Sequence, residues 1–117
     1  MQSIAQNFSV DNGNGRVLKV LDWYVYDSCF VIISEYDKDF ESLFNCTTKQ
    51  PGKHFTEEKC KTIFKLICKL IFKLNKNGIF HHDIKPENFL YNLKTEEIKL
   101  LDFGHSVFND TETNPEV

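Results

Sequence analysis

The chain has 117 residues and a net charge of −3; hydrophobic residues make up 41% of it and charged residues 26%. This length allows at most one domain with a modest core, and this composition argues against a disordered chain. The charge gives no general attraction to nucleic acid or to an anionic membrane, so neither is an expected partner. Lysines interrupt the most apolar run, residues 63–74, so we expect no segment to span a bilayer.

The cysteines indicate a reducing compartment. They form no CxxC motif and have no spacing typical of a metal site, and residues 1–10 lack the basic region and apolar run of a secretory signal. We therefore expect an intracellular, cytoplasmic protein with free thiols, with the nucleus as an alternative location. The cysteines are Cys29, Cys46, Cys60 and Cys68.

The first third of the chain predicts a leader and a hairpin. Residues 1–16 are polar and end in NGNGR, which favours a turn or frayed segment over a packed element. In residues 16–35, RVLKVLDW alternates as a strand does, YVYDS is typical of a turn, and CFVII is typical of a buried strand. The segment SEYDKDFESLF that follows is polar at first and becomes helical toward its end.

A long amphipathic helix of about five turns follows the loop at Pro51. Thr56 is placed to cap its N-terminus, and Asn77 with Gly78 to end it. Cys60 and Cys68, both on the apolar side of this helix, are expected to be core residues. A lysine stripe marks the solvated face, and the alternative of an acidic partner is not favoured by an acidic chain. The expected apolar face is Cys60, Ile63, Phe64, Ile67, Leu70, Ile71 and Leu74, and the lysine stripe is Lys61, Lys65, Lys69 and Lys73.

Residues 81–104 contain the chemistry. A loop, HHDIKPEN, leads to the strand FLY, a turn at LKTEE and the strand IKLLD, which we expect to pair as a hairpin. The pairing would bring Asn88 and Asp102 to one end of that hairpin, where their oxygens form a hard environment suited to Mg²⁺. Asp83 could then accept a proton from an attacking hydroxyl, and Lys85 could neutralise a phosphoryl group in transfer. This spacing predicts half of a site for phosphoryl transfer.

HHDIKPENFL followed by LLDFG resembles the catalytic and metal-binding loops of eukaryotic protein kinases, H-R-D-x-K-x-x-N and D-F-G. The similarity runs from about residue 17 to 108 and is greatest to the Pim-type branch of the calmodulin-kinase-like Ser/Thr kinases. The fold class it implies is α+β, a partial kinase domain with a hinge hairpin, a long helix and a catalytic hairpin. The expected organisation is a leader over 1–16, the partial domain over 17–108 and a polar tail over 109–117, the start of an activation segment.

The resemblance also implies roles for individual residues. Asp83, Lys85 and Asn88 correspond to catalytic residues, with Asn88 and Asp102 as metal ligands. The implied cofactors are ATP and Mg²⁺, and the implied partner is a protein with a Ser or Thr acceptor. The implied adenine site comprises the hinge Glu35, Tyr36 and Asp37, with Ser34 as gatekeeper, Leu90 beneath the ring and Phe103 behind the metal site.

The resemblance is incomplete. No G-x-G-x-x-G is found, because the third glycine position after Gly13 and Gly15 is Leu18, and Lys19 is interpreted as an exposed strand residue. The arginine of H-R-D is replaced by His82, which makes regulation by loop phosphorylation doubtful. The expected function is Ser/Thr kinase chemistry in a truncated domain. The alternatives are an inactive module that binds another kinase or regulatory protein through the exposed helix face, and a metal-binding protein that uses His81, His82 and Asp83.

Overall fold

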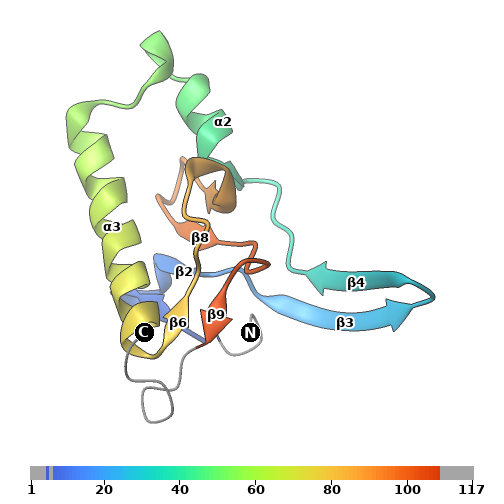
Figure 1. Cartoon of the computed structure of the whole chain (residues 1–117). Coiled ribbons are helices and arrows are strands. Elements are labelled where there is room, and N and C mark those ends of the chain that lie inside the picture. Colours follow the sequence, from blue (N-terminus) through green and yellow to red (C-terminus); the bar gives the residue numbers. More distant parts are fainter. Residues whose placement is uncertain (1–4, 6, 109–117) are drawn as a thin grey trace.

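The computed structural model describes Ala5 and residues 7–108, so the predicted tail over 109–117 lies outside the described residues. Its centre is a five-stranded sheet with the order β1-β2-β8-β7-β5 (Figure 1). β7 and β8 form the predicted antiparallel hairpin, and β2 pairs with β8 in parallel. Segments from both ends of the chain therefore lie side by side in one sheet. The strands are β1 Ser9–Val10, β2 Gly15–Val17, β5 Glu41–Ser42, β7 Phe89–Tyr91 and β8 Ile98–Leu100.

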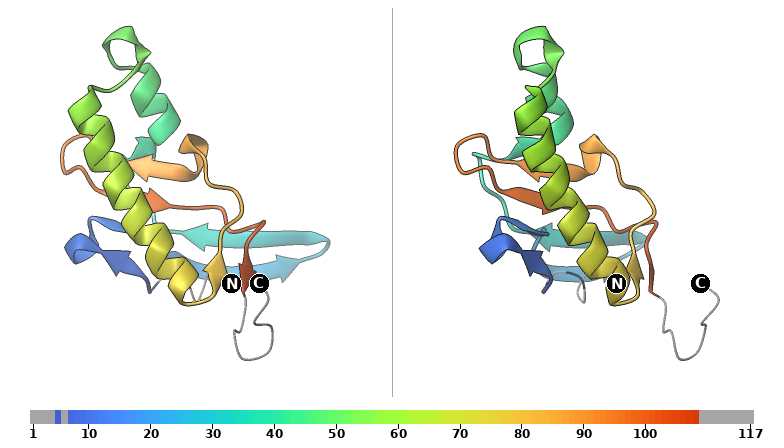
Figure 2. Two further views of the ribbon diagram at one scale, coloured as in Figure 1. Left: turned by 60° about the vertical axis from the view of Figure 1, so that its left-hand side comes forward. Right: turned by 90° about the vertical axis from the view of Figure 1, so that its left-hand side faces the viewer.

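The long helix α3, Glu57–Lys76, lies across one face of this sheet (Figure 2). Both of its predicted ends are confirmed. The Thr56 side chain accepts a hydrogen bond from the Lys59 N–H at the N-terminus, and Asn77 caps the other end. Gly78 then follows with a φ of +82°, a left-handed conformation that glycine adopts without strain.

The predicted apolar face of α3 is only partly correct. Leu66, which was not assigned to it, is buried, whereas Phe64, Cys60 and Cys68 are exposed, so the prediction that both cysteines are core residues is wrong. The reason is that the sheet covers one side of the helix only. Cys60, Phe64, Cys68 and Phe72 form an exposed row at steps of four residues beside the buried stripe. The buried stripe is Ile63, Leu66, Leu70 and Leu74.

Residues 8–16 of the polar N-terminal segment are packed rather than frayed, so the prediction is wrong for this part of it. β1 pairs with β2, and Phe8 and Val10 pack against the core. A Cβ at Gly15 would lie 2.9 Å from Val10 Cγ2 and 3.0 Å from Leu66 Cδ1, so only glycine permits this close approach. Two members of the lysine stripe, Lys69 and Lys73, bond to Asp11 and to the Ser9 carbonyl respectively, and hold the segment on α3.

The predicted hairpin over residues 16–35 is confirmed in part, as β3 Val20–Tyr26 and β4 Cys29–Ser34, which pair antiparallel around Asp27 and Ser28. Figure 1 shows this hairpin projecting away from the rest of the molecule. The expectation that CFVII is a buried strand is wrong, because Phe30, Ile32 and Ile33 are exposed. Among the described elements, none covers either face of the hairpin.

The remaining elements are short. β6 and β9 pair in a separate two-stranded sheet, and α2 is the predicted short helix after the hinge, capped by the Ser42 side chain. The mixture of sheet and helix confirms the α+β class. No helix among the described residues is suited to crossing a bilayer. These elements are η1 Asp11–Gly13, α2 Leu43–Thr48, η2 Pro51–Lys53, β6 Ile79–Phe80, η3 Pro86–Asn88 and β9 Val107–Phe108.

Candidate active site

His81 organises the loop between β6 and β7. Its Nδ1 accepts a hydrogen bond from the Asp83 N–H at 3.1 Å, and its Nε2 lies 2.9 Å from the Leu101 carbonyl oxygen. One neutral tautomer, protonated at Nε2, satisfies both contacts. The buried ring also packs edge-on against Phe103, with a centroid separation of 4.7 Å. His81 therefore joins the loop that carries Asp83 to the strand end that leads to Asp102.

Asp83, Lys85 and Asn88 lie together in the structure. The buried Asn88 amide donates from Nδ2 to the Asp83 carbonyl oxygen at 2.8 Å and to Asp83 Oδ2 at 3.0 Å. The ammonium group of Lys85 lies 3.7 Å from Asp83 Oδ1. The carboxylate is thus held by an amide on one oxygen and faced by a cation on the other, while its side chain keeps contact with solvent. This arrangement keeps the carboxylate oriented and available to a hydroxyl group.

Asp102 directly follows Leu101, the residue that connects the end of β8 to the catalytic loop through a backbone hydrogen bond. The Leu101 N–H donates to the Asn88 carbonyl oxygen at 3.0 Å, so Asn88 and Asp102 flank the same end of the hairpin. Asp102 is exposed, has a φ of +62°, and its Oδ1 accepts a hydrogen bond from the Gly104 N–H. A left-handed conformation is uncommon for a residue with a side chain, and it turns the chain sharply after the strand.

The oxygens of these two residues fit a divalent cation. The Asn88 amide nitrogen is committed to Asp83, which leaves Oδ1 as the side-chain atom that could face a cation. The exposed Asp102 supplies a carboxylate group as the second ligand. An amide oxygen and a carboxylate oxygen, completed by water and phosphate oxygens, are ligands that Mg²⁺ prefers.

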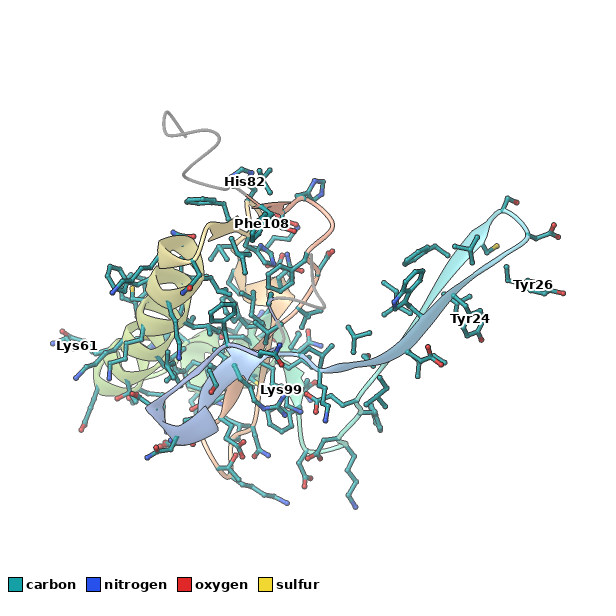
Figure 3. All side chains as sticks on the ribbon, turned by 90° about the horizontal axis from the view of Figure 1, so that it is seen from below. Tyr24, Tyr26, Lys61, His82, Lys99 and Phe108 are labelled. Atoms are coloured by element: carbon teal, nitrogen blue, oxygen red, sulfur yellow. The ribbon has the colours of Figure 1, made fainter. Side chains whose placement is uncertain are left out.

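The predicted hinge follows β4 directly, and Glu35 is bound from three sides. Arg16 donates to its two carboxylate oxygens at 2.6 and 3.1 Å, the Lys19 N–H donates at 3.2 Å, and the Lys99 ammonium group lies 3.4 Å away. Lys99 has only 3% of its surface exposed, and its Nζ sits 3.8 Å from the centre of the Phe40 ring. Figure 3 shows Lys99 in the body of the molecule and Tyr24 and Tyr26 out on the hairpin.

This ion network affects both the hinge and the charge of Glu35. Partial burial alone would raise the pKa of Glu35, but the Arg16 hydrogen bond, the Lys19 N–H and the charges of Arg16 and Lys99 outweigh it, so the pKa lies below its ordinary value. The carboxylate is therefore ionised at neutral pH and fastens the start of the hinge to β2 and β8.

Of the other predicted adenine-site residues, Leu90 lies on β7, Ser34 ends β4, and Tyr36 and Asp37 follow in the hinge. Leu90 is directly opposite Lys99 in the β7–β8 pair, so both side chains lie on the same face of the sheet. Tyr36 and Asp37 are exposed in the hinge, and Ser34 ends β4 half-buried. Lys19 is exposed between β2 and β3, as expected.

Arg16, Lys99 and His81 were not predicted to position the site. Lys99 carries a signal in the sequence, since a lysine in a strand that is otherwise apolar must be either solvated or paired. Nothing in the sequence marks Arg16, because its partner is nineteen residues away.

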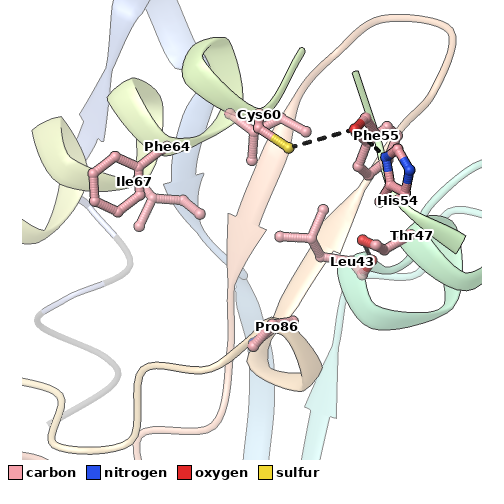
Figure 4. Close-up of a pocket in the computed structure, with 9 residues that line it drawn as sticks. Leu43, Thr47, His54, Phe55, Cys60, Phe64, Ile67 and Pro86 are labelled. Carbon is pink, nitrogen blue, oxygen red and sulfur yellow. Dashed lines mark hydrogen bonds between the residues drawn. The ribbon is translucent and has the colours of Figure 1, made fainter. Parts of the chain in front are cut away.

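An apolar pocket of about 360 Å³ lies between α2, α3 and the catalytic loop (Figure 4). It contains none of the predicted site residues, and only Pro86 connects it to the loop of Lys85 and Asn88. Its lining is Leu43, Thr47, His54, Phe55, Cys60, Ile63, Phe64, Ile67 and Pro86.

The described residues contain no cluster of three metal-ligating side chains, so a metal site built on His81 and His82 has no structural support there.

Comparisons with known proteins agree with the fold and the motif. The family model "Protein kinase domain" matches residues 3–116. Calcium-dependent protein kinase 21 of Oryza sativa is 42% identical over 57 residues, 47% of this chain and 10% of that protein. The probable serine/threonine-protein kinase FMP48 of Saccharomyces cerevisiae is 30% identical over 101 residues, 82% of this chain and 27% of that protein.

A solved structure, the kinase PK-1 of Cydia pomonella granulovirus, superposes with a TM-score of 0.69 at 28% identity, over 92% of this chain and 37% of that one. The chain belongs to the protein kinase domain family, and it carries part of that domain. The chain covers only 10% of the length of calcium-dependent protein kinase 21 and 27% of the length of FMP48.

Proposed function

We propose that this chain provides the catalytic and metal-binding half of a Ser/Thr protein kinase site, which transfers the γ-phosphoryl group of ATP to a protein hydroxyl. The observation that carries the proposal is the grouping of Asp83, Lys85 and Asn88 in one hydrogen-bonded loop at the hairpin end that carries Asp102. Membership of the kinase family and the names of the relatives support the same reaction.

In this proposal each residue has one task. Asp83 accepts the proton of the attacking hydroxyl, and the Asn88 amide keeps the carboxylate oriented toward it. Lys85 neutralises charge on the transferring phosphoryl group. Asn88 Oδ1 and Asp102 would hold Mg²⁺, which would neutralise the phosphate oxygens. The hinge backbone over residues 35–37 would meet adenine above Leu90.

The proposal is tested by transplanting residues 7–108, which include β1, β2 and Arg16, into the granulovirus kinase PK-1, in place of the segment that superposes on them. We expect this chimera to phosphorylate a Ser/Thr peptide. Asp83→Asn should lower its kcat by about 10²–10⁴-fold, because the general base is removed. Glu87→Gln, which changes an exposed carboxylate in the same loop, is the matched control and should retain activity. A folded chimera that is inactive, or whose activity survives Asp83→Asn, would contradict the proposal.

A second candidate is an inactive module that binds another protein. The observation that favours it is the uncovered apolar surface of α3 and of the β3–β4 hairpin. The two candidates differ in nucleotide binding by the chain itself. Because the 117 residues contain no glycine-rich loop followed by a strand lysine, we expect Mg·ATP to raise the melting temperature little or not at all. A clear shift that Asp102→Ala abolishes would show that the chain binds nucleotide alone.

A further inference from the structure

The ammonium group of Lys99 contacts both ends of the hinge segment, residues 35–40. Its Nζ lies 3.4 Å from Glu35 Oε1, directly after β4, and 3.8 Å from the centre of the Phe40 ring, directly before β5. Lys99 itself belongs to β8, and only 3% of its surface is exposed. Residues 36–39, between the two contacts, are all exposed. One buried side chain therefore joins the two ends of an exposed segment.

The backbone of the hinge segment is held at the same two ends. The Glu35 N–H donates to the Lys19 carbonyl oxygen at 3.0 Å, and the Lys19 N–H donates to the Glu35 carboxylate at 3.2 Å. At the other end, the Phe40 N–H donates to the Asp37 carbonyl oxygen at 3.1 Å. Because a residue has only one backbone N–H, Glu35 has its carbonyl oxygen left for a ligand. The position of that carbonyl group is restrained by the contacts that hold the rest of the residue.

The burial of Lys99 is explained by these contacts rather than by its own strand. Its neighbours in β8, Ile98 and Leu100, are fully buried apolar residues. Burying an ammonium group costs free energy, and a carboxylate and an aromatic face offset that cost only while they stay in place. Arg16 on β2 holds the same carboxylate through two contacts, at 2.6 and 3.1 Å. Glu35 is therefore fixed between two neighbouring strands of the central sheet.

We propose that Lys99 and Arg16 are positioning residues for the nucleotide, which hold the hinge backbone at the separation from Leu90 that an adenine ring needs. The inference rests on the proposed function, in which adenine lies between the hinge and Leu90. Lys99 is directly opposite Leu90 in the β7–β8 pair, so both belong to the same part of the sheet. Neither positioning residue is among those assigned to phosphoryl transfer. Their effect is therefore on the affinity for ATP and not on the chemical step.

The first test is Lys99→Met in the chimera with PK-1. Methionine keeps the length and the contact with an aromatic ring but removes the charge, and Arg16 still pairs with Glu35, so the fold should not lose stability. We expect KM for ATP to rise about tenfold, as for the loss of one hydrogen bond, with kcat changed less than about twofold. Arg16→Lys keeps the charge but cannot make both contacts, so it should raise KM for ATP about threefold.

Lys94→Met is the matched control. Lys94 lies in the turn between β7 and β8 and also pairs with the hinge segment, at 3.7 Å from Asp39, but its side chain is 80% exposed. An exposed ion pair contributes little, so KM for ATP should stay within about twofold of that of the unsubstituted chimera. The proposal is overturned if Lys99→Met leaves KM for ATP unchanged, or if it lowers kcat by as much as it raises KM.

The second test needs no activity and uses amide hydrogen exchange in the 117-residue chain. In Lys99→Met the Glu35 and Phe40 amides should exchange about tenfold faster than in wild type, whereas the amides of β7 should keep their rates. Unchanged rates at Glu35 and Phe40, or equal acceleration throughout the sheet, would overturn the proposal, since the second result means that Lys99 only stabilises the fold. An inactive unsubstituted chimera contradicts the proposed function alone, and the exchange rates then decide whether Lys99 positions the hinge.

Discussion

Glu35 shows how a single residue connects the fold to the candidate site. Its carboxylate binds Arg16 on β2 and lies beside the buried Lys99 on β8, so it fixes where β4 ends and the hinge begins. A lysine with almost no exposed surface needs a partner, because burying an unpaired charge is costly. The family resemblance predicts Glu35 as a hinge residue, whereas its role as an ion-pair partner follows only from the packing of β2 and β8.

The lowered pKa of Glu35 predicts a specific dependence of stability on pH. A carboxylate whose pKa is depressed in the folded state stabilises the fold at pH values above its ordinary pKa, and this stabilisation is lost as the pH falls through the folded-state value. Glu35→Gln should therefore reduce stability by about 1–3 kcal/mol at neutral pH and weaken the further loss on acidification below its ordinary pKa.

The measurement is urea unfolding of wild type and Glu35→Gln at several pH values from neutral to acidic. Glu87→Gln, an exposed carboxylate without an ion pair among the described residues, is the control and should follow the wild-type profile. Parallel profiles for wild type and Glu35→Gln would show that the ion network does not contribute to acid sensitivity.

At the scale of elements, α3 has two apolar rows with different environments. Leu70 is fully buried against the sheet, while Phe64, in the neighbouring row, is largely exposed. Helical spacing alone assigned both to one face, because periodicity shows which residues share a side but not how much of that side is covered. The sheet decides which of the two rows becomes core.

Substitutions in the two rows should therefore have very different costs. Leu70→Ala should lower the free energy of unfolding by about 2–5 kcal/mol, because it removes buried methyl groups and leaves a cavity. Phe64→Ala, although it removes a larger side chain, should change it by no more than about 0.5 kcal/mol. Chemical denaturation of both variants provides the comparison. A cost for Phe64→Ala as large as that for Leu70→Ala would mean that this row is covered in solution.

The whole molecule combines a packed body with a projecting arm. The body contains the five-stranded sheet, α3 and the catalytic loop, whereas the β3–β4 hairpin contributes few buried side chains. Local stability follows burial and contact density, so the two regions should open with different free energies.

Amide hydrogen exchange should detect this difference. Amides in β7 and β8 should exchange most slowly and those in β3 and β4 much faster. Equal protection of body and hairpin would show that the hairpin is as stable as the body.

The sequence by itself determined the features that depend on neighbouring residues. Thr56 and Gly78 mark the ends of α3 through local capping, and the spacing from His81 to Gly104 predicted the catalytic hairpin and the family. These signals are reliable because capping, turns and loop motifs involve contacts over a few positions. The roles assigned to the site residues stay predictions, although the structure brings Asp83, Lys85 and Asn88 into contact.

Only the tertiary structure decided which surfaces are buried. It placed β1 and β2 in the central sheet, paired Arg16 with Glu35, buried Lys99 and left the apolar side chains of β3 and β4 exposed. Composition made β1 look like a polar leader and β4 look like a core strand, and both predictions were wrong. The physical reason is that burial depends on what packs against an element, and those partners lie far away in the sequence.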